Sequence, residues 1–200
     1  MCLLDILFGF HYKSPLNILQ LNSCMGVDVR KFLFDKVSTK ENVFGVDLRQ
    51  EFIDAGYVLF EDKERMSENF FTVDLLKEDF VGVLEKNSGS SKFDVVYLGS
   101  VFHLLNLPEC TLLANRVFQI TSNDGFFFGR TMGYIDGENR TASWSGEDRF
   151  LLSKKGLQEL LEQSGFKQVQ VTESELDQPH YNPGEEQLRS MLSFSGFKRD

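Results

Sequence analysis

Two aspartates stand where short apolar runs end, and they are the side chains of this sequence best suited to ligand chemistry. Asp47 ends the run 42–47 and Asp74 ends the run 70–74. A carboxylate about 20 residues beyond a glycine-containing turn can accept hydrogen bonds from ribose hydroxyls, and a second carboxylate can accept one from the exocyclic amine of adenine. Each aspartate alone is equally well explained as a helix N-cap. The pair together favours a nucleoside site.

The turn over residues 22–26 precedes the first of these aspartates and reads Asn-Ser-Cys-Met-Gly. A glycine in such a turn lets the backbone approach a ligand closely and adopt conformations that other residues avoid. Gly26 is the one glycine of this stretch. The motif is therefore weak by itself, and an ordinary turn between a strand and a helix explains it equally well.

His103 and Arg130 are the candidate catalytic residues. His103 follows the run 93–98 and Gly99, and a histidine there can act as a general base near neutral pH. A hydrogen-bonded structural histidine is the alternative, and we favour it. Arg130 follows the run 125–129 and can hold a carboxylate through two parallel hydrogen bonds; its alternative is a surface ion pair.

Alternating strand-like and helix-like segments position these residues. Such alternation indicates an α/β fold with a mostly parallel sheet, right-handed crossovers and helices on both faces. Ligands of such sheets bind beyond the carboxyl ends of the strands, where both aspartates are expected. The predicted strands are 17–21, 42–47, 70–74, 93–98, 125–129, 167–171 and 188–197, and the predicted helices are 28–34, 50–60, 81–86, 107–119 and 154–164.

The size and charge of the chain limit its architecture and partners. Its 200 residues are 42% hydrophobic, enough for a core, so we expect one domain over residues 1–200 with a short N-terminal segment over residues 1–14. The net charge of −9 and the pI near 4.9 argue against nucleic acid as a partner, because a nucleic acid requires a basic face.

The start of the chain and its cysteines predict a cytoplasmic protein without a membrane partner. The apolar run 1–10 contains Asp5, lacks a preceding basic residue and is too short to span a bilayer. The three cysteines, Cys2, Cys24 and Cys110, are odd in number and far apart. This spacing fits a reducing compartment and gives no metal site.

Four segments, in this order, resemble the class I S-adenosylmethionine-dependent methyltransferases, and more narrowly the small fungal methyltransferases of meroterpenoid and related secondary-metabolite pathways. They are 18–31, 44–53, 71–74 and 93–103, and the segments 129–133 and 154–165 extend the likeness. The resemblance implies a Rossmann-like sheet of seven strands whose last strand, 188–197, is antiparallel. It also implies S-adenosylmethionine as the cofactor, held by Asn22, Gly26, Asp47, Leu48, Asp74, Leu75 and Gly99.

The first loop departs from the pattern of this family. The family has an acidic residue in the strand and then three alternate glycines, whereas these positions hold Gln20, Asn22, Cys24 and Gly26. In the family, the acidic residue orients the loop and the amino group of the cofactor. Side chains at positions 22 and 24 bring Cβ atoms towards the methionine moiety, and each such position costs about 1–3 kcal/mol.

The resemblance also concerns the N-terminus, where relatives carry helices that close over cofactor and substrate. About sixteen residues precede the first predicted strand here. We expect a minimal lid or one supplied by another subunit, which is consistent with a homodimer.

The leading hypothesis is methyl transfer to a small-molecule acceptor in secondary metabolism. The methyl group would go to the oxygen of a carboxylate or hydroxyl of a terpenoid-like compound. A carboxylate acceptor is ionised at neutral pH and needs no base, whereas a phenol needs His103 as base. The alternative is a degenerate member of the fold without methylation activity, either a cofactor-independent cyclase-type enzyme or a binding partner. A nicotinamide-dependent dehydrogenase is less favoured, because its glycine fingerprint is absent.

Overall fold

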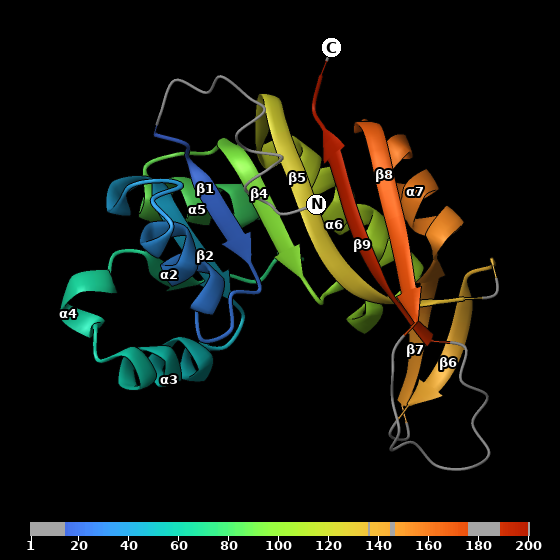
Figure 1. Cartoon of the computed structure of the whole chain (residues 1–200), viewed down its shortest axis with the longest axis horizontal. Helices are drawn as coiled ribbons and strands as arrows, with labels where there is room; N and C mark the ends of the chain where they lie inside the picture. The colour runs from blue at the N-terminus through green and yellow to red at the C-terminus, as the bar shows by residue number, and fades with distance from the viewer. Residues whose placement is uncertain (1–14, 136, 145–146, 176–188, 200) are drawn as a thin grey trace. The chain divides into compact units, whose positions relative to one another are not determined.

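The computed structural model of the chain describes residues 15–135, 137–144, 147–175 and 189–199 (Figure 1). The chain divides into two compact units, Met1–Tyr97 and Leu98–Asp200. The predicted N-terminal segment 1–14, with Cys2, lies outside the described residues. Across those described residues, every helix is too short or too polar to cross a membrane.

The first unit is built on strands in the order β3-β2-β1-β4. β1 pairs in parallel with β2, and β2 pairs in parallel with β3. Every residue of β1 and β2 is buried, as expected of parallel strands that are covered on both faces. The strands are β1 (Ile18–Leu21), β2 (Val43–Asp47), β3 (Phe70–Thr72) and β4 (Phe93–Gly99), of which residues 93–97 belong to this unit.

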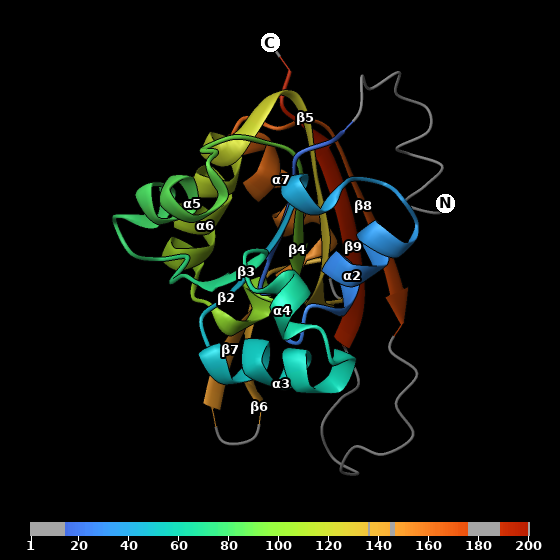
Figure 2. The same cartoon turned by 90° about the vertical axis from the view of Figure 1, so that its left-hand side faces the viewer.

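Helices cover these strands on both sides. Figure 2 shows α2 and α5 on opposite sides of the strands of this unit. Both helices are amphipathic: α2 buries Val29 and Phe32, and α5 buries Phe80 and Leu84. The helical elements of the unit are α2 (Val27–Phe34), the 3-10 turn η1 (Lys40–Asn42), α3 (Gln50–Phe60), α4 (Lys63–Met66) and α5 (Phe80–Ser88).

The second unit is centred on the long strand β5 (Thr121–Tyr134). β9 (Arg189–Phe197) pairs antiparallel with β5 and with β8 (Lys167–Glu175). β7 (Glu147–Ser153) pairs in parallel with the end of β5 and forms an antiparallel hairpin with β6 (Arg140–Trp144). The helical elements of the unit are the 3-10 turn η2 (Phe102–Leu104), α6 (Leu107–Ile120) and α7 (Lys154–Gln163).

Local sequence explains the bounds of the helices in this unit. A capping box begins α6, because Asn106 accepts a hydrogen bond from the backbone N–H of Glu109, whose carboxylate accepts one from the N–H of Asn106. Gly165, with a φ of +108°, follows α7, in agreement with its predicted role as the terminating glycine.

A phenylalanine cluster fills the core of this unit: the centre of the Phe127 ring lies 5.1 Å from that of Phe166 and 5.3 Å from that of Phe194.

The predicted fold class, a Rossmann-like α/β fold with an antiparallel last strand, is confirmed. The described residues form nine strands instead of seven, because the hairpin β6–β7 is inserted between β5 and α7. The prediction that the fifth strand ends at Gly129 is wrong. β9 pairs with β5 as far as Tyr134, so Arg130 lies within the strand and not beyond its end.

Candidate functional site

The loop between β1 and α2 has an unusual backbone. Asn22, Cys24 and Gly26 have φ angles of 57°, 50° and 70°, all in the left-handed region that glycine adopts most readily. These are the three alternate positions at which the resemblance implies glycine. Two of the glycines are absent, but the loop keeps the backbone conformation that they would supply.

Gly26 itself is required by close packing. A Cβ atom at this position would lie 2.3 Å from the ring of Phe70 and 2.7 Å from Nη1 of Arg30. Gly56 of α3 approaches the same loop, because a Cβ there would lie 2.3 Å from the carbonyl oxygen of Met25. The loop is therefore clamped between α2, α3 and β3.

Asp47 fixes this loop from the end of β2. Its side chain is buried, Oδ2 accepts a 2.8 Å hydrogen bond from the backbone N–H of Cys24, and Oδ1 accepts one of 3.0 Å from the N–H of Arg49. The neighbouring backbone is tied as well, since the N–H of Val73 donates to the carbonyl oxygen of Asp47 at 2.9 Å. One carboxylate thus connects the turns that follow β1 and β2, and each oxygen keeps a second lone pair for a ligand.

Neither predicted aspartate is a helix N-cap. The N-cap of α3 is Arg49 and that of α5 is Asp79. The Oδ1 atom of Asp74 instead accepts a 2.9 Å hydrogen bond from the backbone N–H of Leu76, which forms a local turn. Asp74 is half-buried and lies two residues beyond the end of β3 at Thr72. The structure thus places Asp47 and Asp74 after adjacent parallel strands, which was the arrangement expected of a nucleoside site.

Leu48 and Leu75 follow the two aspartates in the same turns. The side chain of Leu48 is 66% exposed, which leaves apolar surface next to Asp47 in the chain. Leu75 is half-buried. Gly99 is the last residue of β4, and Ser100 after it has a φ of 60° and donates its N–H to the carbonyl oxygen of Arg130 at 2.8 Å.

Gln20 is a site residue whose structural role the sequence reasoning missed. It is 3% exposed, and its Nε2 donates a 3.0 Å hydrogen bond to Oδ2 of Asp28 in the first turn of α2. A carboxylate therefore stands next to the position where the family pattern has its acidic residue. Oε1 of Gln20 and Oγ of Ser23 are buried without a hydrogen-bond partner among the described residues, and such atoms ordinarily bind water or a ligand.

In the second unit, the structure does not bring the two catalytic candidates together. His103 is buried, and its Nδ1 lies 3.1 Å from Oγ1 of Thr131 on β5. Thr131 is buried, whereas its neighbour Arg130 is exposed. Successive side chains of a strand point to opposite faces, so Arg130 points away from the face that holds His103.

The cysteines of the described residues are free thiols. Burial raises the pKa of Cys110 to about 12, which keeps this thiol protonated and unreactive at neutral pH. Within the described part of the chain, no group of histidine, cysteine and acidic side chains is arranged to hold a metal ion.

Comparison with known proteins agrees with this architecture. No family model matches the chain. The phosphoethanolamine N-methyltransferase 2 of Haemonchus contortus, solved with S-adenosylhomocysteine, has a TM-score of 0.66 at 12% identity and matches 98% of this chain and 52% of its own. The 1,6-didemethyltoxoflavin-N1-methyltransferase of Burkholderia thailandensis has a TM-score of 0.65 at 20% identity over 98% of this chain and 76% of its own. The chain has the fold of class I S-adenosylmethionine-dependent methyltransferases.

Curated relatives are fungal methyltransferases. The O-methyltransferase atr3 of Stereocaulon alpinum is 35% identical over 52% of this chain and 29% of its own length. The methyltransferase nvfJ of Aspergillus novofumigatus, which acts on asnovolin E and chermesin D by its name, is 25% identical over 89% of this chain and 60% of its own. The predicted resemblance to fungal secondary-metabolite methyltransferases is confirmed, and the chain spans less than two thirds of the length of these relatives.

Proposed function

We propose that this chain binds S-adenosylmethionine at the carboxyl ends of β1, β2 and β3, and that the protein transfers its methyl group to an oxygen of a small-molecule acceptor in secondary metabolism. The observation that carries the proposal is the loop 22–26. Asn22, Cys24 and Gly26 share the left-handed conformation, and Asp47 holds the loop by a hydrogen bond. A turn in this conformation lets the backbone approach a ligand closely.

The residues present fit the cofactor. In this proposal, Asp47 accepts hydrogen bonds from the ribose hydroxyls and Asp74 accepts one from the adenine amine. The buried Oε1 of Gln20 and Oγ of Ser23 are acceptors for an ammonium group, so Gln20 can take over a role that an acidic residue has in the family. We assign the methionine end of the cofactor to these two side chains and the nucleoside end to the two aspartates.

S-adenosylmethionine, when bound, supplies a methyl group on a positively charged sulfur, which an acceptor oxygen can attack. The contribution of the chain is to orient the two reactants and to exclude water. His103 is tied to Thr131, which supports its structural role. A carboxylate acceptor, which needs no base, is therefore favoured, and the exposed Arg130 is the candidate for holding it.

A direct experiment is incubation of the chain with S-adenosylmethionine carrying a ¹³C-labelled methyl group and a panel of terpenoid carboxylic acids and phenols. We expect a labelled methyl ester by mass spectrometry. If the cofactor binds but none of these acceptors is methylated, methyl transfer is contradicted and the degenerate alternative takes its place.

A variant tests the assignment of Gln20. Gln20→Leu keeps the size of the buried side chain but removes the acceptor oxygen, so S-adenosylhomocysteine should bind at least about tenfold more weakly, the equivalent of one hydrogen bond to a charged group. Adenosine lacks the ammonium group and should bind as it does to the wild type. Equal losses for the two ligands would contradict the assignment.

A further inference from the structure

A pocket of about 620 Å³ lies in the first unit, between α2, η1 and the turn from α3 to α4. Its volume is in the range of small-molecule sites. Lys40 precedes β2 and Met66 precedes β3, so the pocket extends towards the amino ends of the strands. Asp47 and Asp74 follow the carboxyl ends of the same strands. None of the residues assigned to the cofactor lines this pocket, so the two sites differ in their residues, although Arg30 of the lining also donates to the carbonyl oxygens of Met25 and Gly26 at 2.7 and 3.1 Å.

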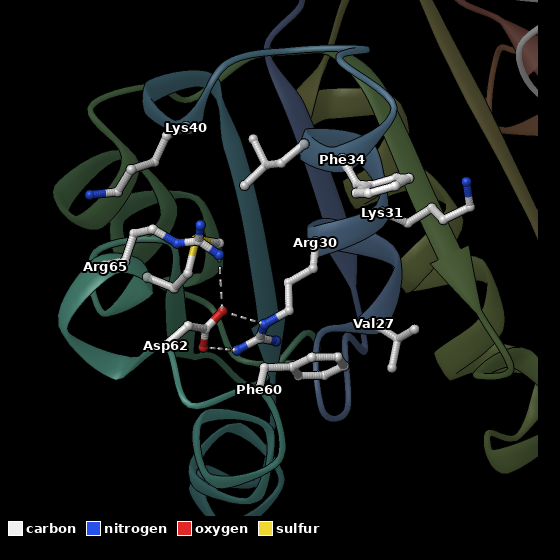
Figure 3. Close-up of a pocket in the computed structure, with 10 residues that line it drawn as sticks. Val27, Arg30, Lys31, Phe34, Lys40, Phe60, Asp62 and Arg65 are labelled. Atoms are coloured by element: carbon white, nitrogen blue, oxygen red, sulfur yellow. Dashed lines mark hydrogen bonds and ion pairs between the residues drawn. The ribbon is translucent and has the colours of Figure 1, made fainter.

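Apolar side chains form one part of this pocket. Phe34 and Val27, on the outer face of α2, are 83% and 51% exposed, and Phe60 at the end of α3 is 38% exposed. Figure 3 shows Phe34 and Val27 on one side of the pocket and Phe60 next to the guanidinium of Arg30. Large exposed apolar side chains that gather at a concave surface commonly mark a binding site.

Most of the polar side chains of the lining are cations, although the protein has a net charge of −9. The lining contains four cations, Arg30, Lys31, Lys40 and Arg65, but a single acid, Asp62. Asp62 is neutralised by Arg30, which donates to both carboxylate oxygens at 2.8 Å. The lining therefore keeps an excess of positive charge, although Lys31 is itself paired with Asp35.

Two of these cations are loosely paired. Nζ of Lys40 lies 4.0 Å from a carboxylate oxygen of Glu68, and Nη2 of Arg65 lies 3.8 Å from Oδ2 of Asp62. Both separations exceed hydrogen-bond length. In Figure 3, Lys40 and Arg65 stand across the pocket from Phe34 and Val27. An anionic head group can therefore meet the cations while an apolar body lies against the aromatic side.

We propose that this pocket binds an amphipathic acid: a small molecule with an apolar body and one carboxylate. Val27, Phe34 and Phe60 contact the body, and Lys40 with Arg65 binds the carboxylate. Arg30 is not available for this task, because it is held by Asp62 and stacks on Phe60 at 4.4 Å. Arg30 instead forms part of the apolar side of the lining through its contact with Phe60.

Decanoate is a suitable probe, with decan-1-ol as the uncharged probe of equal chain length and acetate as the charge without the chain. ¹³C-methyl methionine spectra report the site, because Met66 lines the pocket; Met132, on β5 of the other unit, serves as the reference. We expect decanoate to shift the Met66 signal, decan-1-ol to bind at least about tenfold more weakly, and acetate to have no effect. Equal affinity for decanoate and decan-1-ol would overturn the proposal in favour of a plain apolar contact surface.

The double variant Lys40→Gln/Arg65→Gln should weaken decanoate binding by about tenfold or more, since it removes both charged donors to the carboxylate, but leave decan-1-ol unchanged. Phe34→Ser should weaken both probes. Lys86→Gln, on the exposed face of α5, is the matched control and should change neither. Unchanged decanoate affinity in the double variant would contradict the proposal.

The same titration is repeated with saturating S-adenosylhomocysteine. An unchanged decanoate affinity is expected, because the two sites are distinct, and competition would overturn the assignment of decanoate to this pocket. If S-adenosylhomocysteine does not bind at all, the proposed function fails while the decanoate site stands, so the two failures are distinguishable.

Discussion

The backbone N–H of Cys24 donates a 2.8 Å hydrogen bond to Oδ2 of Asp47. These residues are 23 positions apart in the chain, and the bond joins the turn after β1 to the end of β2. Cys24 has a φ of 50°, a conformation that a side chain makes costly. The carboxylate of Asp47 stabilises this conformation, which explains how the loop is kept at a position without glycine.

Asp47→Ala should therefore impair stability as well as binding. The variant leaves the N–H groups of Cys24 and Arg49 without their acceptor, so the free energy of unfolding should fall by about 1–3 kcal/mol, measured by urea denaturation. Asp74→Ala is the control, since one backbone N–H depends on its carboxylate and the loss of stability should be smaller. Both variants should weaken adenosine binding. A stable Asp47→Ala protein with wild-type affinity would refute the role of Asp47.

Replacement of Asn22 and Cys24 by glycine should relieve backbone strain. Each substitution at a left-handed residue should raise stability by up to about 1 kcal/mol, and removal of both Cβ atoms should tighten S-adenosylmethionine binding more than adenosine binding. Lys36 has a φ of 57° just beyond α2, so Lys36→Gly is the matched control: it should stabilise without changing affinity. If the loop variant tightens both ligands equally, the two side chains act through loop flexibility and not at the methionine end.

The helices and strands that could be predicted from the sequence are those with a clear local pattern of apolar residues. The helix 50–60 was predicted with the bounds that α3 has, because its apolar spacing and its position after a buried strand agree. The hairpin β6–β7 was not predicted, because Ala142 and Trp144 are the apolar residues of the sequence 140–149, which therefore lacks the apolar alternation of a strand. The end of β5 was misplaced for a related reason, since its continuation depends on pairing with β9, about sixty residues away.

The sequence predicted which residues of the candidate site lie near strand ends, but not which side chains hydrogen-bond to one another. Asp47 and Asp74 follow from where apolar runs stop. The pairing of Gln20 with Asp28 and of His103 with Thr131 depends on which faces meet in the folded chain. A single sequence without a comparison across homologues does not carry that information. The roles of His103 and Arg130 in catalysis, the homodimer and the cytoplasmic location stay predictions.

The catalytic candidates can be separated by a pair of variants. With a carboxylate acceptor, His103→Gln should leave the rate within a few-fold of the wild type, and Arg130→Lys should lose far more, because a point charge cannot replace a planar donor with two prongs. With a phenol acceptor, loss of a general base should cost on the order of 10²–10⁴ in rate. The rate should be flat between about pH 6 and 8 for a carboxylate and rise over that range for a base-dependent reaction.

Asp62 should make stability depend on pH. The hydrogen bonds from Arg30 lower the pKa of this carboxyl, so its stabilising effect is fully present above the ordinary aspartate pKa of about 3.9 and is lost as the pH falls through the lowered value. Asp62→Asn should therefore be clearly less stable than the wild type at pH 7, with the difference shrinking below about pH 4. Asp54→Asn, at an exposed position of α3, is the control. A difference that is independent of pH would exclude the ion pair as its source.

The central claim is that the loop 22–26 and the two aspartates form a working cofactor site. Calorimetric titration of the chain with S-adenosylhomocysteine and, separately, with adenosine tests it most directly. Saturable binding of one ligand molecule per chain is expected, with S-adenosylhomocysteine bound more tightly than adenosine because the methionine end adds contacts with Gln20 and Ser23. Absence of heat for both ligands with the folded chain would contradict it.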